Sequence, residues 1–231
     1  MNVPRSVLLC SLLLSLCFVV SCASHKTSSL PPLTMDVNAQ KTKLEEKGFV
    51  SMAKPIYNQA ELKTFFDRDL IVDDVLPVHI YLLNKSYGKP CTFNVAGINL
   101  LDSSGSRVPM LSMEQLMDKV QKSHWRSLGW GAAFGLLGAI PSSVNVARTN
   151  EKIRVDYEGR VLKNGTVFPG ASAEGIAFFS IPANTSSLDG WKLTTVIADP
   201  SDSTNFNIEH LLEGTIETRE KEEQEQTPAP K

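Results

Sequence analysis

Apolar residues recur in short stretches along most of the chain, and these stretches predict β-strands. Residues 76–83 form an almost continuous apolar run, which predicts a strand covered on both faces. Residues 92–101 alternate, with a change of parity at Ala96-Gly97 that predicts a β-bulge. Further strands are expected at residues 107–111, 153–157, 175–182, 191–197 and 206–208. This spacing indicates a mainly β protein, a β-sandwich.

Turn signals separate several of these strands. Residues 102–106 are rich in Ser, Gly and Asp, which predicts a tight turn before the return strand. The dipeptide Asn164-Gly165 interrupts the apolar residues of 161–167 and predicts a hairpin turn there.

Two helices are expected between the strands. One covers about residues 59–67 after Asn58, and the other begins at the capping-box pattern of Ser112 and Gln115. The second helix carries an apolar stripe at helical spacing, which we interpret as core packing. The stripe consists of Met113, Leu116, Met117 and Val120.

The first 21 residues have the three parts of a secretory signal. Arg5 is the only charged residue before position 25, and residues 7–20 are apolar. This run is shorter than a membrane-spanning helix requires. Residues 19–22, Val-Val-Ser-Cys, resemble the lipobox of bacterial lipoproteins. The resemblance implies cleavage before Cys22 and lipid modification of its thiol; an ordinary cleaved signal peptide is the alternative.

Lipidation would make the membrane a partner of this protein through the anchor at Cys22. The lipoprotein resemblance also bears on location, because Ala23 is not the Asp that retains enterobacterial lipoproteins at the inner membrane. An outer-membrane anchor in the cell envelope is therefore expected, on a side that the sequence does not indicate. The remaining mature cysteine, Cys91, is expected to be a buried small residue.

The sequence divides into four parts. Residues 1–21 are the signal peptide, and residues 22–34 are a polar, Pro-containing, lipid-anchored tether. Residues 35–216 form the β-sandwich domain, in which 112–150 are a helical and Gly-rich insert. Residues 217–231 are rich in Glu, Lys and Gln, and we expect them to be a disordered tail.

The apolar part of the insert is the candidate contact surface. It carries no charge from Ser127 to Ala147, and Gly131 and Gly135 recur at a spacing that gives a helix a smooth face. About 13 apolar residues make roughly 20 Å of helix, short of a ~30 Å hydrocarbon core. An interfacial hairpin, self-association, an envelope protein partner and a plain Gly-rich connection stay open. The candidate residues for membrane or partner contact are Trp125, Trp130, Gly131, Phe134, Gly135, Leu136 and Leu137.

The body also resembles a family of uncharacterised bacterial lipoproteins with immunoglobulin-like domains. Residues 76–86 look like the strand and Asn turn of such domains, and residues 169–181 look like their later Pro-Gly element and apolar strand. The resemblance implies an immunoglobulin-like β-sandwich, although the chain lacks the paired cysteines around a tryptophan. It implies fold more than function.

Charge and residue spacing narrow the function classes. Lys and Arg total 23 against 25 Asp and Glu, a net charge of −2, which argues against a nucleic-acid partner. The isolated histidines give no zinc-ligand spacing, and we expect no metal and no cofactor. We expect the acidic residues Asp67, Asp69, Asp73 and Asp74 to form a solvated rim.

No catalytic motif emerges, so a non-enzymatic, lipid-anchored envelope protein that acts by binding or structural contact is favoured. One alternative is a periplasmic or secreted hydrolase with an unrecognised site. Another is a ligand- or glycan-binding module, which would expose Trp125, Trp130 or Trp191 on a flat face.

Overall fold

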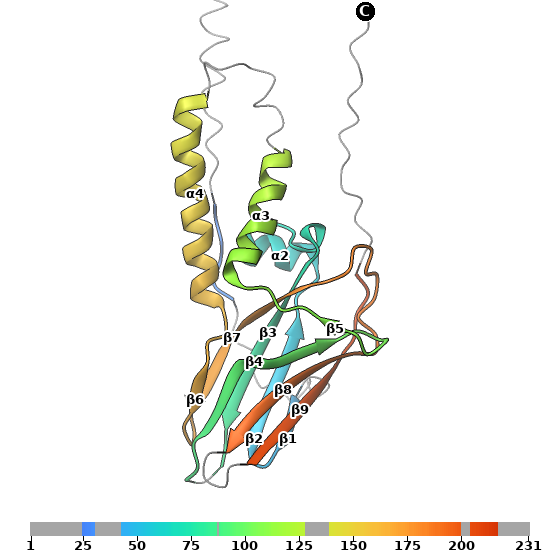
Figure 1. The fold of residues 1–231 in the computed structure, drawn as a ribbon. Coiled ribbons are helices and arrows are strands. Elements are labelled where there is room, and N and C mark those ends of the chain that lie inside the picture. The colour runs from blue at the N-terminus through green and yellow to red at the C-terminus, as the bar shows by residue number, and fades with distance from the viewer. Residues whose placement is uncertain (1–24, 31–42, 87, 128–138, 200–203, 217–231) are drawn as a thin grey trace, which may run out of the picture.

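The computed structural model describes residues 25–30, 43–86, 88–127, 139–199 and 204–216, and the side chains of 121–146 lie outside this description. Two antiparallel sheets face each other (Figure 1). The first has the order β1-β2-β3-β7, and the second has the order β5-β4-β8-β9 with β6 paired to β4. The strands are β1 Lys43–Glu46, β2 Phe49–Pro55, β3 Val75–Asn84, β4 Cys91–Leu101, β5 Arg107–Val108, β6 Gly165–Val167, β7 Ser172–Ser180, β8 Trp191–Asp199 and β9 Thr204–Leu212.

The core lies between the two sheets. Ser51 of β2 and His210 of β9 meet across this interior, so their cross-strand neighbours Leu82 and Leu193 also point inward. Leu82 and Leu193 are fully buried, and such apolar pairs drive the two sheets together. The predicted mainly β sandwich is therefore confirmed.

The predicted bulge and turn are both present. The β4–β8 register shifts between Phe93 and Ile98, and both side chains are buried, as a bulge at Ala96-Gly97 requires. In the turn, the Asp102 carboxylate accepts hydrogen bonds from the backbone N–H groups of Ser104 and Ser106. The turn thus satisfies its own backbone, and β5 follows it directly.

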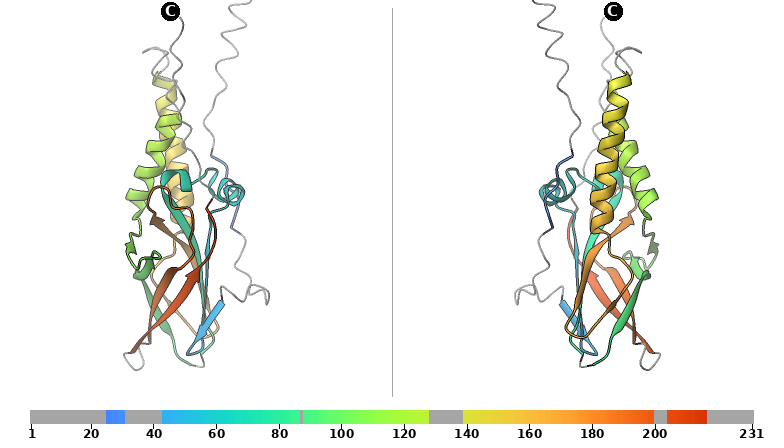
Figure 2. Two further views of the ribbon diagram at one scale, coloured as in Figure 1. Left: turned by 90° about the vertical axis from the view of Figure 1, so that its right-hand side faces the viewer. Right: turned by 90° about the vertical axis from the view of Figure 1, so that its left-hand side faces the viewer.

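The helical segments among the described residues lie at one end of the sandwich (Figures 1 and 2). They are α2 Gln59–Phe66, the 3-10 turn η3 Ile71–Asp73, α3 Met113–Ser127 and α4 Ala139–Arg160. Asn58 caps α2, and at the start of α3 the side chains of Ser112 and Gln115 bond each other's backbone N–H groups. Leu116, Met117 and Val120 are buried, which confirms the core packing predicted for this stripe.

α4 corrects the prediction of a strand over residues 153–157. Ile153 and Tyr157 are buried but Val155 is 59% exposed, which is the pattern of a helix and not of a strand. The positions i and i+4 are even-spaced, so a helix face and a strand face place the same two residues inward. The helix extends ten residues beyond the predicted end of the insert at 150, so the helices are not all short.

The hairpin predicted at Asn164-Gly165 is also wrong. Val161 bridges Ile176 of β7, whereas β6 pairs with β4, so the two halves join different sheets. The Asn164 side chain accepts a hydrogen bond from the Val95 N–H at 2.7 Å instead of supporting a two-residue turn.

The free edge of β7 is covered by two chain segments. The Leu162 N–H donates to the Ile176 carbonyl at 3.0 Å, and the Leu111 N–H donates to the Phe178 carbonyl at 2.8 Å. Gly175 allows the first segment to come close, because a Cβ at this position would lie 2.5 Å from the Leu162 Cα. The edge is therefore paired along much of its length.

Candidate functional site

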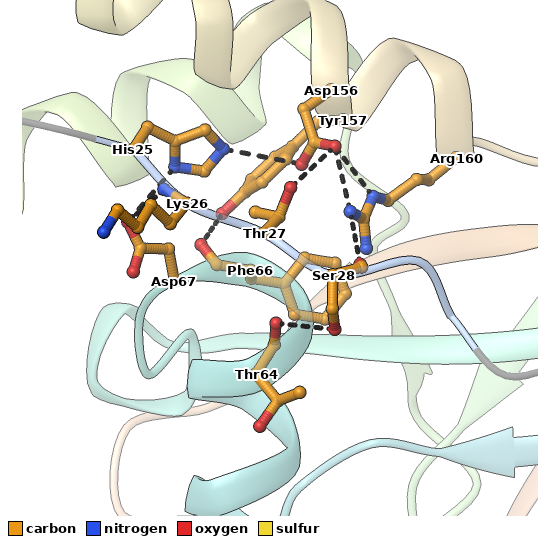
Figure 3. A network of polar contacts seen from close by, with 10 residues as sticks. All are labelled: His25, Lys26, Thr27, Ser28, Thr64, Phe66, Asp67, Asp156, Tyr157 and Arg160. Atoms are coloured by element: carbon orange, nitrogen blue, oxygen red, sulfur yellow. Dashed lines mark hydrogen bonds and ion pairs between the residues drawn. The ribbon is translucent and has the colours of Figure 1, made fainter.

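Residues 25–30, which follow the predicted lipidation site, lie against α2 and the C-terminal part of α4 (Figure 3). The Lys26 N–H donates to Asp67 Oδ2 at 2.8 Å, and the Ser28 N–H donates to the Thr64 carbonyl at 3.1 Å. The Ser28 carbonyl accepts a hydrogen bond from Arg160 Nη2 at 2.8 Å. Part of the segment predicted to be a tether is therefore docked on the body.

The His25 imidazole lies between two carboxylates. Its Nδ1 is 3.6 Å from Asp67 Oδ2, and its Nε2 is 3.5 Å from Asp156 Oδ2. The His25 side chain is only 7% exposed, and its ring meets the Tyr157 ring edge-on at 6.4 Å between centroids. Because the carboxylates lie on opposite ring nitrogens, the three groups do not converge on one point; the described residues contain no cluster suited to a metal ion.

An aromatic cluster packs between the docked segment and the sheet. Tyr157 of α4 stacks on Phe178 of β7 at 5.8 Å and meets Phe66 of α2 edge-on at 5.5 Å. The Tyr157 hydroxyl donates to the Phe66 carbonyl at 3.3 Å, and burial raises the pKa of this phenol. The Arg160 guanidinium lies over the Phe66 ring at 5.8 Å, so side-chain contacts join α4, α2 and the sheet beneath the docked segment.

Polar contacts also hold the middle of α3. Arg68 pairs with Asp73 and donates from Nη1 to the Val120 carbonyl at 2.8 Å. Lys119 reaches the backbone carbonyls of Asp73 and Asp74. The Asp73 side chain is only 4% exposed and pairs with Arg68, so the predicted solvated acidic rim is wrong for this residue, whereas the Asp67 side chain is 36% exposed.

Of the residues predicted to make contacts, one lies in a described helix. Trp125 belongs to α3, but its side chain is not described. The other predicted residues, Cys22, Trp130, Gly131, Phe134, Gly135, Leu136 and Leu137, lie outside the described residues. None of the described helices is both long and apolar enough to cross a membrane.

An apolar pocket of about 350 Å³ opens where α3, α4 and the two sheets meet. Its walls include Met110, Met113, Leu116, Val161 and Phe178, with the Ser112 hydroxyl group beside them. The pocket can accept a small apolar group, but among its lining residues there is no charged side chain to orient a reactive substrate.

Ser51 and His210 form a nucleophile–base contact in the core. Ser51 Oγ lies 2.8 Å from His210 Nε2, and the two residues are 0% and 2% exposed. Burial lowers the pKa of His210 to about 4, and its Nδ1 has no hydrogen-bond partner. The pair is sealed between the sheets, so a substrate could reach it only if the sandwich opened.

The structure also shows the surroundings of three single residues, His79, Cys91 and Trp191. His79 is buried, with Nε2 at 2.8 Å from Glu174 Oε1, and Cys91 is buried as expected. Trp191 is 4% exposed and belongs to the core, so it cannot contribute to a flat glycan-binding face.

Sequence reasoning missed the docking site. The two partners of His25, Asp67 and Asp156, lie 42 and 131 positions away along the chain, and no local pattern links them to it. The helical spacing of Asp156 and Arg160 was the available signal, since such i, i+4 pairs form on helices.

Comparisons with known proteins give a weak structural similarity. No protein-family model matches the chain, and no curated protein matches it. One solved structure to which it is similar is that of the yjhA protein from Bacillus subtilis, at 14% identity and a TM-score of 0.37. The match covers 71% of this chain and 93% of that chain, and a likeness at this level carries no argument about function.

Proposed function

We propose that this protein is a lipid-anchored component of the cell envelope, held in the outer membrane, that acts by binding or structural contact. Cys22 carries the lipid, and the helical end of the sandwich faces the bilayer or an envelope partner. The observation that supports this proposal is the docking of residues 25–30, which begins three residues after Cys22.

The docked segment has a direction. Ser28 contacts Arg160, whereas His25 contacts Asp156, one helical turn nearer the N-terminal end of α4. From Ser28 back to His25 the chain therefore runs along α4 and away from the sheets. Three residues span at most about 11 Å, which keeps the anchor close to the helices.

The length of α4 completes the argument. From Asp156 to Ala139 the helix rises by about 25 Å, more than the largest distance between His25 and Cys22. α3 and α4 both point away from the sandwich (Figure 1). A bilayer at the level of Cys22 would therefore meet the helical end first, where the sequence carries its apolar, uncharged insert.

Lipidation is tested by metabolic labelling with a palmitate analogue followed by membrane fractionation. We expect label in the wild type and in Cys91→Ala, the matched control for a buried cysteine, and none in Cys22→Ala. Label that persists in Cys22→Ala, or a wild type without label, would contradict the proposal.

The contact surface is tested in the Cys22→Ala background, where the lipid no longer retains the protein. Gly131→Leu with Gly135→Leu adds apolar area at the insert, while Gly159→Leu adds it at the base of α4, where the structure leaves open space. Stronger membrane retention of the first variant alone supports lipid contact, and loss of protein crosslinks supports a partner. Identical wash-off and crosslinking in both variants would eliminate the insert as the contact.

The described residues give no support to the two alternative functions, a hydrolase and a ligand- or glycan-binding module. The Ser51–His210 pair is inaccessible, which argues against its use by a hydrolase. The buried Trp191 removes one of the three tryptophans on which a glycan-binding face would depend.

A further inference from the structure

We propose that residues 25–30 are a protonation-dependent latch. In its closed state the segment is docked on α2 and α4, as in this structure, and both nitrogens of the His25 ring carry a proton. In its open state one proton has left the ring and the segment has detached from the two helices. A neutral imidazole has one N–H donor and one lone pair. Here each ring nitrogen faces a carboxylate oxygen, Asp67 at one side and Asp156 at the other. The neutral ring would therefore point a lone pair at one carboxylate, whereas the protonated ring offers an N–H to both.

Charged groups of two helical segments surround the His25 ring. Asp67 follows α2 and Asp156 lies on α4, while Arg160, one turn further along α4, pairs with Asp156 Oδ1 at 2.9 Å. This leaves Asp156 Oδ2 buried without a hydrogen bond, and His25 Nε2 is in the same condition. Tyr157 contributes a neutral ring beneath, and the Lys26 side chain is exposed. Two carboxylates and one guanidinium leave one negative charge, which the imidazolium neutralises.

The other contacts of residues 25–30 are weak enough for the segment to detach once the His25 contacts are lost. The hydrogen bonds of Lys26 and Ser28 lie at the exposed surface, where water competes for the same groups. Thr27 Oγ1 donates to Asp156 Oδ1, the oxygen that Arg160 already holds. The sheltered His25 contacts are therefore the part of the latch that a change in proton concentration can alter.

Opening the latch would change the reach of the body. With the latch closed, three residues connect Cys22 to the docked His25, about 11 Å at most. If it opens, the next strand begins at Lys43, and 21 residues of chain span up to about 70 Å. This consequence depends on the proposed lipid anchor, but the latch does not.

Hydrogen exchange measured by mass spectrometry tests the latch on the full-length chain in mild detergent. Protection factors of the 25–30 amides are measured from about pH 5 to about pH 8, with intrinsic exchange rates divided out. We expect protection to fall about tenfold as pH rises, the ratio typical of a sheltered charge-assisted contact. Strand β3 (75–84) is the internal reference and should stay constant.

Two variants separate the latch from general unfolding. In His25→Gln the ring is replaced by a neutral group, so we expect low protection at every pH; in His25→Lys a permanent cation should keep protection high at every pH. A flat wild-type profile, protection that increases with pH, or an unchanged profile in His25→Gln would each overturn the latch. If the wild type carried no palmitate label but kept the pH-dependent protection of residues 25–30, the proposed lipid anchor would be refuted and the latch would stand.

Discussion

The buried His210 predicts that this protein loses stability in mild acid. Its pKa is lowered from 6.5 to about 4 because burial between the sheets disfavours the charged ring. Its Nδ1 has no partner, so a proton added there would leave a buried N–H with no acceptor. The unfolded chain has no such restriction and takes up the proton at the ordinary pKa.

The sign and size follow from proton linkage. Below about pH 6.5 the unfolded state binds a proton that the native state refuses, so the free energy of unfolding falls as pH falls. With folded and unfolded pKa values of about 4 and 6.5, the loss is about 2 kcal/mol at about pH 5 and about 3 kcal/mol at about pH 4.

Urea denaturation followed by tryptophan fluorescence measures this loss, because Trp191 lies in β8, next to β9. The perturbation is His210→Gln, which does not titrate but can still hydrogen-bond Ser51. The variant should be less stable at neutral pH but should lose about 2 kcal/mol less than the wild type between about pH 7 and about pH 5.

Other titrating groups cancel in this comparison. Burial also lowers the pKa of His79, so protonation of His79 in acid lowers the free energy of unfolding of the wild type and of His210→Gln in the same direction. The reasoning would be refuted if His210→Gln kept the full acid sensitivity of the wild type.

Three further substitutions test the fold around the site. Gly175→Ala should destabilise by about 1–3 kcal/mol in urea denaturation, because its Cβ would meet the Leu162 backbone; a neutral result would mean that this segment is not held against β7. Asn84→Ala should cost about 2–3 kcal/mol, since it leaves the buried Val167 carbonyl without its donor, and a thermal melt with an unshifted midpoint would contradict this. Asn58→Ala removes the α2 cap and should cost about 1 kcal/mol, with faster hydrogen exchange in α2; unchanged exchange there would exclude a role for the cap.

The strands could be predicted from sequence because their signal is local. The apolar run of β3 and the parity change in β4 each lie within about ten residues, and burial on a sheet produces both patterns directly. α4 could not be separated from a strand over 153–157, because Ile153 and Tyr157 satisfy both periods. Val155, exposed on the helix, looks in the sequence like a third inward residue.

The docking site could not be predicted for a different reason. His25, Asp67 and Asp156 come from three distant parts of the chain, and each alone is an ordinary polar residue near a helix or a terminus. Their juxtaposition depends on how α2 and α4 pack on Phe178, which is a property of the tertiary fold. The capping box of α3 was readable because its two members are three residues apart.

The two segments that cover the edge of β7 restrict how other chains can join this protein. An uncovered edge strand offers a row of backbone donors and acceptors on which a foreign strand can grow. At β7 the carbonyls of Ile176 and Phe178 are already occupied, so an incoming peptide would first have to peel away residues 161–162 or 109–111. Association by sheet extension, including fibril-like stacking, is therefore disfavoured along this strand.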